Sequence, residues 1–430
     1  MEYSELTAGE FDTFVDSQAT GSFMQSSMMG ARRDGNGWTM RMVGVKHDGA
    51  VVAAALLSSR NVLGGFADVE CLQGPVLDYR DAPLRTFFFT RLEEDLKAHK
   101  VLNFTFNPKL LANHRDQDAN VIDDGYTDAD VVQALAELGF EHQDNAEVDA
   151  NPLYLRWYFA KDLTGITTPE QLLAGFDGQA TRSVKKVLKS PIEVSALAED
   201  ELDQFFAVMR HTGERRGFDY RDEDYYRSLA HVFGPEHIEF LVARLDVERY
   251  EGELAAQVKT DSAALEKARA ALEAAPDNAK NAKRLAAAEQ TWGSSQTKLA
   301  DLPKLREDGP HAVLTAAVFI TFAGETVFLA GGSYDHYSHF HASYALHWHA
   351  LQEAMARGIR RYNFYGTKGE FSNNPEQHGV YRFKRGFGGV VEEQTGYFTS
   401  TPNKAAEKAR ETVSVLRGAV GSLRSKLSGK

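Results

Sequence analysis

The chain has 430 residues, with 48 lysine and arginine residues against 61 aspartate and glutamate residues, so its formal net charge is −13. Hydrophobic residues make up 43% of the sequence and charged residues 25%, which is typical of a folded protein with a large core and excludes disorder as its main state. The single cysteine, Cys71, excludes intramolecular disulfides and cysteine-rich zinc modules. The negative charge argues against non-specific binding of nucleic acid, DNA included.

Strands and helices alternate over the first 160 residues. Strand-like runs at 38–45 and 50–57 flank the turn sequence Asp48-Gly49, which predicts a hairpin. Apolar residues recur at helical spacing over 81–99, and 101–106 is a β-type run. This mixture of strands and helices predicts an α/β or α+β fold.

A second series of the same kind begins at Thr168-Pro169, which is a helix start with proline at the first helical position. Helices are expected at 201–216 and 344–356, and strands at 237–245, 312–322 and 361–365. Because the two halves share their order of elements, we expect two similar α/β units. The first domain is expected over 1–160, with the segment 390–430 packing on it, and the second over 161–390.

Residues 248–307 differ from their surroundings, being rich in Ala, Glu, Lys and Leu. Apolar residues fall seven apart in two runs, which are Val258, Leu265 and Leu272, then Leu285, Trp292 and Leu299. A break at 275–278 separates the runs, so the pattern predicts an antiparallel coiled-coil arm inserted in the second domain. Its balanced charge suits a spacer or an oligomer contact as well as a contact with tRNA.

The sequence Arg32-Arg33-Asp34-Gly35-Asn36-Gly37 fits R-x-x-G-x-G, the pyrophosphate loop of acetyl-CoA-dependent N-acetyltransferases. Such a loop needs a helix after it, because the amides at a helix start face the phosphates. Residues 38–45 have a strand pattern instead. We therefore favour a plain turn here and keep a CoA-dependent N-acetyltransferase as an alternative function.

Five histidines crowd the stretch 336–349. The pairs spaced two apart point away from each other on a helix, so no metal site is expected. The sequence also lacks a Walker motif, a G-x-S-x-G motif and a Cys/His nucleophile pair. An enzyme of this kind would position two substrates and stabilise charge.

Cations alternate with aromatic residues in two places. The stretch 379–389 contains Phe383, Lys384 and closely spaced glycines, which suits a ring or base lying close to the backbone, or equally a β-hairpin edge with solvated cations. In the stretch 215–226, Arg221 stands at the mouth of a helix expected to begin near residue 222, with Tyr225 one turn in. Arg221 could bind a phosphate as a planar fork or pair with the acidic residues beside it.

Taken together, these residues resemble the FemABX family of non-ribosomal peptidyl transferases. The resemblance spans nearly the whole chain and is carried, in the family's order, by the motifs at 23–26, 181–186, 221–225, 362–366 and 381–388. It implies two acetyltransferase-like (GNAT-like) domains, and some members of the family carry a coiled-coil arm in the second.

The resemblance also implies an activity. The family transfers an amino acid from aminoacyl-tRNA to the side-chain amine of the third stem-peptide residue of a peptidoglycan precursor, either UDP-MurNAc-pentapeptide or a lipid-linked form such as lipid II. This builds the interpeptide bridge, and aminoacyl-tRNA is a co-substrate, so no cofactor is implied. A non-catalytic coiled-coil scaffold is the remaining alternative, and the sequence does not show which amino acid is transferred.

A cytoplasmic location is expected, because the sequence shows neither a secretion signal nor an apolar run that spans a bilayer. The basic tail at 401–430 is expected either to touch the inner face of an anionic membrane or to pack on the first domain.

Five site residues follow from the resemblance. Arg33 stands where the family often has a lysine that binds the precursor's phosphates, and Arg221 and Tyr225 resemble the other precursor-binding pair. Phe383 and Lys384 resemble residues associated with the aminoacyl-tRNA end and the reacting carbonyl.

One departure from the family lies at Asn107-Pro108, where Asp-Pro is frequent. An amide cannot act as a base, so a role for that carboxylate cannot be carried over to this chain.

Overall fold

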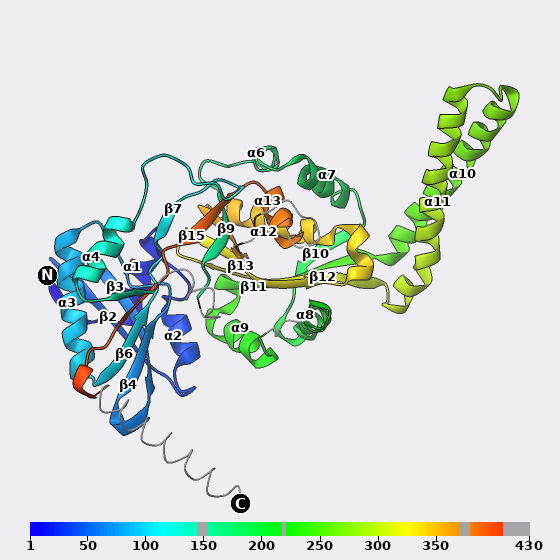
Figure 1. Ribbon diagram of the computed structural model, residues 1–430. Helices are drawn as coiled ribbons and strands as arrows, with labels where there is room; N and C mark the ends of the chain where they lie inside the picture. The colour runs from blue at the N-terminus through cyan, green and yellow to red at the C-terminus, as the bar shows by residue number, and fades with distance from the viewer. Residues whose placement is uncertain (144–153, 217–220, 368, 370, 372–378, 407–430) are drawn as a thin grey trace, which may run out of the picture.

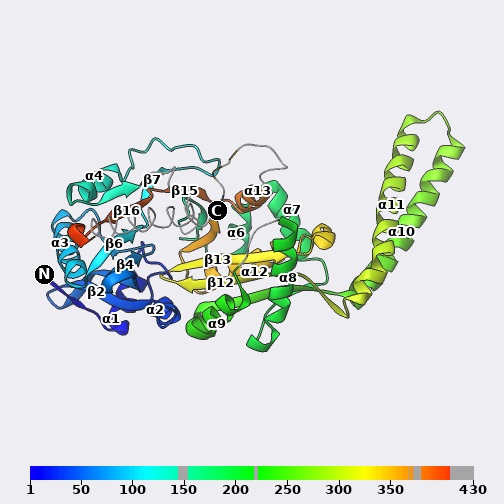
Figure 2. The same cartoon turned by 60° about the horizontal axis from the view of Figure 1, so that its bottom comes forward.

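The computed structural model describes residues 1–143, 154–216, 221–367, 369, 371 and 379–406. Two eight-stranded sheets form its frame, and a long helical arm projects away from both of them (Figures 1 and 2). None of the described helices is long and apolar enough to cross a membrane.

The first sheet runs in the order β1-β2-β3-β4-β6-β16-β8, with β5 paired to β3. Its strands are β1 (Glu2–Glu5), β2 (Thr39–His47), β3 (Ala50–Asn61), β4 (Ala67–Cys71), β5 (Val76–Leu77), β6 (Val101–Phe106), β8 (Glu141–Gln143) and β16 (Tyr397–Ser400). Its helices are α1 (Ala8–Ser17), α2 (Ser27–Arg33), α3 (Ala82–Ala98) and α4 (Ala129–Glu137).

The second sheet runs in the order β10-β11-β12-β13-β14-β9-β15-β7. Its strands are β7 (Leu111–His114), β9 (Trp157–Asp162), β10 (Ile192–Ala196), β11 (Ile238–Asp246), β12 (His311–Phe322), β13 (Glu325–Ser333), β14 (Arg361–Gly366) and β15 (Val390–Gln394). Its helices are α6 (Pro169–Ala174), α7 (Gly178–Val187), α8 (Asp203–Arg216), α9 (Glu223–His237), α12 (Ala342–Ala356) and α13 (Gly379–Gly386).

Local sequence explains where several of these elements begin and turn. Asp48 and Gly49 both have positive φ, 51° and 83°, as a tight hairpin between β2 and β3 requires. Helix α3 begins after Asp81, whose carboxylate accepts a hydrogen bond from the backbone N–H of Leu84 at 3.0 Å. Thr168 caps α6 in the same way, with a capping box to Gln171.

The two units share a topology, as the order of elements predicted. In each, antiparallel strands lead to one parallel pair, which is β4 with β6 in the first unit and β13 with β14 in the second. A helix joins the members of each pair, α3 in the first unit and α12 in the second. Parallel neighbours need such a crossover connection.

Three apolar cores hold the layers together. Helices α3 and α4 cover one face of the first sheet, and α6, α7 and α12 cover one face of the second. Between the two sheets lies a shared core, in which Phe11 of α1 and Met29 of α2 belong to the same cluster as Phe205 of α8 and Tyr226 of α9. The two units are therefore packed on each other through side chains that are as buried as those within either unit.

The chain crosses between the units more often than the predicted boundaries suggest. Residue 160, the expected boundary, lies inside β9, and all of β9 pairs within the second sheet. The short strand β7 leaves the first half to pair with β15 in the second sheet. The segment 390–430 was expected to pack on the first domain. Its strand β16 joins the first sheet, but its strand β15 joins the second. Residues 407–430 lie outside the described part of the chain.

The arm consists of α10 (Val247–Ala274) and α11 (Ala279–Glu307), which connect β11 to β12. At its root the backbone N–H of Val247 donates to the carbonyl oxygen of Pro310 at 3.0 Å, so the chain enters and leaves at one point. The predicted antiparallel arm and the break near 275–278 agree with these helices.

The seam of the arm differs in detail from the heptad prediction. Leu254, Leu265 and Leu302 are buried, and a buried hydrogen bond joins Ser295 to Asp261 across the seam. Leu299, which was expected in the seam, is 39% exposed, so its buried neighbours Ser295 and Leu302 form the seam at that level.

Candidate functional site

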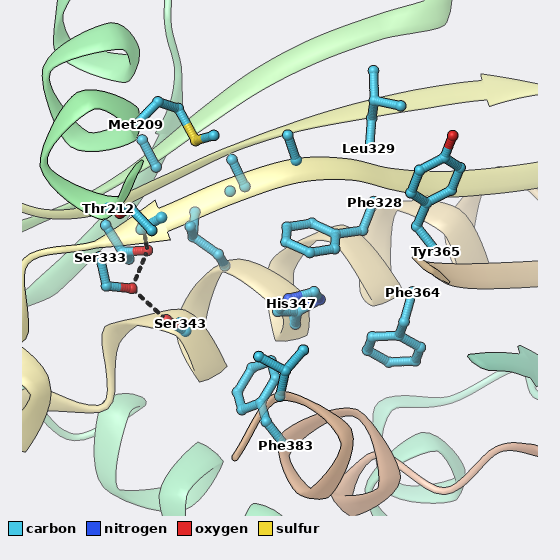
Figure 3. Close-up of a pocket in the computed structure, with 18 of the residues that line it drawn as sticks. Met209, Thr212, Phe328, Leu329, Ser333, Ser343, His347, Phe364, Tyr365 and Phe383 are labelled. Carbon is cyan, nitrogen blue, oxygen red and sulfur yellow. Dashed lines mark hydrogen bonds between the residues drawn. The ribbon is translucent and has the colours of Figure 1, made fainter. Parts of the chain in front are cut away.

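A cavity of about 670 Å³ opens in the second unit. Its lining comes from strands β12, β13 and β14, from helices α12 and α13 on one face of these strands, and from α8 and the start of α9 on the other face (Figure 3). The lining is mostly apolar with a few polar groups, as is usual for sites that bind small molecules. Three residues predicted from the sequence, Arg221, Phe383 and Lys384, all line this cavity.

Lys384 is held in the cavity wall by two backbone carbonyls. Its side chain comes from α13 and is buried, and Nζ donates to the carbonyl oxygen of Gly366 at 2.6 Å and to that of Tyr365 at 3.3 Å. The end of β14 is irregular, since the register with β9 shifts after Asn363 and Tyr365 has a φ of +64°. Gly366 still pairs with Tyr158 of β9, and this irregular strand end presents both carbonyls to the ammonium.

Burial lowers the pKa of Lys384 to about 7. Water solvates an ammonium far better than two carbonyl dipoles do, so the charged form is disfavoured. An ammonium has three N–H donors. With two of them on carbonyls, the third is available to a ligand in the cavity.

Aromatic rings surround the cavity beside Lys384. Figure 3 shows Phe328, Phe364 and Phe383 around the imidazole of His347. Ring centroids lie 4.7 Å from His347 for Phe328, 5.3 Å for Phe364 and 5.2 Å for Phe383. Phe383 thus forms part of the wall next to Lys384, in a surface that excludes water from the ammonium.

Hydroxyl groups line the opposite part of the cavity. Ser333 of β13 donates to Thr315 of β12 at 3.1 Å and lies 2.9 Å from the hydroxyl of Ser343 at the start of α12, as the dashed lines in Figure 3 show. These groups satisfy one another, so the cavity has a polar end and an aromatic end.

Arg221 and Tyr225 lie where α9 begins. Asp222 caps this helix by accepting from the backbone N–H of Tyr225 at 2.8 Å, so the helix begins where the sequence predicted. The Arg221 guanidinium lies 5.4 Å from the centre of the Tyr225 ring. Within the described part of the chain Arg221 forms no ion pair, which leaves its charge available to an anion.

A second arginine reaches the same tyrosine from the other unit. Arg32 of α2 lies over the Tyr225 ring at 4.1 Å and donates through Nε to Ser228 at 3.1 Å. Burial raises the pKa of the Tyr225 hydroxyl, and the charges of Arg32 and Arg221 oppose that rise. The surface formed by Arg32, Arg221 and Tyr225, called the arginine cluster below, therefore joins the two units beside the cavity.

Comparison with known proteins identifies the family. The sequence model of the FemAB family matches residues 6–414. The chain belongs to the FemAB family. Relatives include "Aminoacyltransferase FemA" of Staphylococcus aureus strains MRSA252 and bovine RF122 / ET3-1, each 30% identical over 406 residues, which are 94% of this chain and 96% of the relative.

The fold agrees with a solved structure. The crystal structure of FemX matches with a TM-score of 0.73 at 22% sequence identity, covering 95% of this chain and 99% of that chain. The predicted α/β fold with two acetyltransferase-like units is confirmed. The FemABX resemblance and the predicted enzyme class, an aminoacyltransferase, are confirmed as well.

Arg33 lies apart from the arginine cluster of this FemAB protein. It forms an ion pair with Glu70 at 3.0 Å and lies over the Trp38 ring at 4.1 Å. Arg32 and Arg33 are neighbours on one helix, so they point in different directions. It is Arg32, named in the sequence only as part of the stretch 32–37, that contacts Tyr225.

Asn107 also lies away from Lys384. Its side-chain oxygen accepts from the backbone N–H of Gln73 at 2.8 Å, beside a cavity of about 20 Å³ that it shares with Lys109 and Arg361. It therefore fixes a turn of the first unit.

The stretch 379–389 differs from one of its two sequence interpretations, the β-hairpin edge. Residues 379–386 form helix α13, so they are not a hairpin edge. A Cβ at Gly388, which has a φ of +67°, would meet the carbonyl oxygen of Gly175 at 1.9 Å, and one at Gly389 would meet that of Ala160 at 2.3 Å. Gly388 and Gly389 therefore allow close packing against neighbouring backbone.

The loop proposed for coenzyme A follows the end of α2 and leads into β2. Gly35 and Gly37 have φ values of 77° and 79°, as a plain turn requires, and the element after them is a strand. This geometry gives the CoA alternative no helix start on which to place a pyrophosphate.

One group of potential metal ligands occurs among the described residues. His211, Asp335 and His336 place their ligand atoms within 4.8 Å of one another. His211 Nε2 and an Asp335 oxygen are 2.6 Å apart, and the charge of Arg215 acts on the same carboxylate. A hydrogen-bonded pair beside an arginine favours an ion pair over a cation site.

His347 and Arg32 belong to the site, although neither was among the site residues predicted from the sequence. His347 was expected to be an ordinary solvent or core histidine. A sequence signal for either is absent, because the aromatic partners of His347 come from β13, β14 and α13, and the partners of Arg32 come from α9.

Proposed function

We propose that this protein transfers an amino acid from aminoacyl-tRNA to the side-chain amine of the third stem-peptide residue of a peptidoglycan precursor. Family membership supports aminoacyl transfer in building the interpeptide bridge. The observation that carries the proposal is the buried Lys384, which lines an apolar cavity together with Phe383 and with Arg221, a cation that has no ion-pair partner in the described part of the chain.

The reaction is the aminolysis of an ester. The acceptor nitrogen forms a bond to the acyl carbon, and the carbonyl oxygen takes up negative charge. When this tetrahedral species collapses, the C–O bond to the tRNA ribose breaks, the ribose oxygen takes a proton, and the nitrogen gives one up. The products are an amide and a free tRNA hydroxyl, so no oxidant, reductant or cofactor is consumed.

Lys384 is suited to stabilise the charge that develops on the carbonyl oxygen. With a pKa of about 7, a large fraction of it is an ammonium at neutral pH. Its third N–H is not used by Gly366 and Tyr365. In a cavity lined by aromatic rings the interaction between ammonium and oxyanion is stronger than in water.

The arginine cluster is suited to bind the phosphates of the precursor. Arg221 has a planar guanidinium at the start of α9, where the helix dipole also favours negative charge. Arg32 adds a second cation from the first unit. In this proposal Arg33, which is paired with Glu70, supports the position of α2 more than it contacts the precursor.

Aminoacyl-tRNA and the precursor's soluble form are cytoplasmic reactants, so we place the enzyme in the cytoplasm. The predicted contact of the tail at 401–430 with a membrane falls mostly on residues that lie outside the described part of the chain. Contact between the arm and tRNA also stays a prediction.

The test is to incubate purified protein with UDP-MurNAc-pentapeptide or lipid II and a panel of charged tRNAs, and to measure the mass of the product. We expect the precursor to gain the mass of one or more amino acid residues, and only with charged tRNA. Absence of any gain with every tRNA, or equal transfer from acetyl-CoA, would overturn the proposal.

A further inference from the structure

A second polar pair lies in the same cavity, and the reaction described above does not use it. His347 of α12 lines the cavity and is buried, with 3% of its surface exposed. Tyr362 of β14 lies behind it and is fully buried, with 0% exposed. A histidine and a tyrosine in an apolar layer need hydrogen-bond partners to offset the loss of water.

The tyrosine fixes the tautomer of the histidine. The Tyr362 hydroxyl lies 2.8 Å from His347 Nδ1, and among the described residues each is the one side-chain hydrogen-bond partner of the other. Burial raises the pKa of Tyr362 well above its usual value, so the hydroxyl keeps its proton. With no other acceptor at hand, it donates to Nδ1, and the ring proton of a neutral imidazole must then be on Nε2.

The imidazole is neutral and held in place. Burial, with a smaller contribution from the charge of Lys384, lowers the pKa of His347 to about 3. The ring stacks on Phe364 and is enclosed by Phe328, Phe383 and Phe387, all with centroids within 5.3 Å. The direction of its N–H is therefore fixed, and the protonation state of the ring does not change with pH in the neutral range.

Within the described residues, nothing accepts a hydrogen bond from His347 Nε2. Nε2 is not one of the fully buried atoms that lack a partner, so it is open to the cavity, where water or a ligand can accept its hydrogen bond. Lys384 faces the same cavity, and its neighbour Phe383 touches the His347 ring. The cavity thus presents two hydrogen-bond donors, the ammonium of Lys384 and the neutral imidazole of His347. Each has one N–H without an acceptor among the described residues.

We propose that His347 Nε2–H donates a hydrogen bond to the acyl carbonyl oxygen of the bound aminoacyl ester, and that Tyr362 is the positioning residue that keeps the proton on Nε2. The inference rests on the proposed function and names a further group that contacts the substrate. His347 donates a hydrogen bond and keeps its proton throughout, so it is neither the acid nor the base of the reaction.

The first experiment measures the tautomer without any substrate. Protein labelled with ¹⁵N-histidine is examined by NMR at neutral pH, with His347→Gln used to assign the signals. We expect one buried imidazole with unprotonated Nδ1 and protonated Nε2, and loss of this single tautomer in Tyr362→Phe. A proton on Nδ1 in the unmodified protein would overturn the inference.

The second experiment measures the donor's effect on the reaction. In His347→Leu/Tyr362→Phe both polar groups are replaced by apolar ones of similar volume, so no buried group is orphaned. We expect kcat to fall about 10²-fold, the cost of removing one oxyanion donor. His347→Gln, whose amide N–H lies near the position of Nε2, should keep most of kcat. Wild-type kcat in the folded double variant would overturn the inference.

The two single variants keep the test decisive. Should the double variant not fold, His347→Gln and Tyr362→Phe are compared, and an unchanged kcat in Tyr362→Phe together with an unchanged tautomer would also overturn the inference. Failure of the proposed function gives a different result, in which the unmodified protein transfers nothing from any charged tRNA while the NMR experiment still reports the tautomer.

Discussion

The two ends of β14 hold two cations in opposite ways. At its start, Arg361 donates to Glu325 at 2.5 Å and also pairs with Glu392, and both carboxylates are buried. At its end, the carbonyls of Tyr365 and Gly366 hold Lys384, which has no carboxylate partner among the described residues. A single strand of six residues thus has a compensated charge at its start and an uncompensated one at its end.

The pKa values show what this difference does. Burial alone would lower the pKa of Arg361, but the charges of Glu392 and Glu325 raise it. Burial alone would raise the pKa of Glu325, but the charges of Lys109 and Arg361 lower it to about 2. The pKa of Lys384, which only burial affects, falls to about 7. A paired cation therefore stays charged at every relevant pH and holds structure, while an unpaired cation becomes sensitive to its surroundings and suited to chemistry.

The largest effect is expected from breaking the compensated end. Arg361→Met leaves the buried Glu392 without its arginine partner and leaves Glu325 with only Lys109 as a counter-charge. We therefore expect the free energy of unfolding to fall by about 3–5 kcal/mol. Urea denaturation measures it, with Arg360→Met, an exposed neighbour, as the control. An unchanged unfolding midpoint in Arg361→Met would remove the distinction between the two ends.

The uncompensated end should lose activity without losing stability. Lys384→Met removes the donor to the oxyanion, so we expect amino-acid transfer to fall about 10²–10³-fold with precursor binding intact. The exposed Lys185→Met is the matched control. Near-normal turnover in Lys384→Met would end the oxyanion role, and lower stability in it would mean that Lys384 is structural.

The pH profile sharpens the same comparison. Lys384 is charged below its pKa of about 7, so we expect kcat to decline by about tenfold per pH unit well above pH 7. In Lys384→Arg this decline should be absent, because an arginine stays charged in this pH range. Single-turnover rates, corrected for hydrolysis of the ester, measure it. A profile that declines equally in both proteins would assign the titration to another group.

Linkage gives the sign of the effect on stability. The folded pKa of Lys384 lies below the unfolded value of about 10.4, so the cost of burying the ammonium is fully present below pH 7 and is relieved as the pH rises toward 10. Relative to Lys384→Met, the unmodified protein should therefore gain stability between pH 7 and pH 10, as urea denaturation at several pH values can show.

The smallest effect is expected in the arginine cluster. Arg32→Ala removes one of two cations beside Tyr225, so we expect KM for the precursor to rise about tenfold with kcat nearly unchanged. Arg33→Ala, its neighbour on α2, should raise KM less, because Arg33 is already paired with Glu70. The reverse order would restore Arg33 as the phosphate contact.

Local pattern predicted much of the fold. Strand 101–106 was predicted with the bounds that β6 has, and the helix at 81–99 and the two-helix arm agree with α3, α10 and α11 within a few residues. These elements have strong periodicity and clear caps, so neighbours in the sequence determine them. Domain boundaries were less predictable, because β7, β15 and β16 find their places by pairing with strands far away in the sequence.

The site was predictable only in part. The cavity contains Arg221, Phe383 and Lys384, which the motifs had singled out. The alternation of cations and aromatic residues around Lys384 was equally compatible with the edge of a β-hairpin. In the structure this stretch is helix α13, where Tyr381 and Lys384, three residues apart, are both buried on one face. Which of two adjacent arginines faces Tyr225 depends on the direction of α2, and that direction is set by packing.

The position of β16 has a consequence for how the protein is made. This strand, residues 397–400, lies between β6 and β8, both of which the ribosome delivers more than 250 residues earlier. Until it emerges, β6 and β8 have open edges that invite pairing with other chains. We expect the N-terminal half, expressed by itself, to be prone to aggregation, and the first sheet to be completed only when synthesis is nearly over.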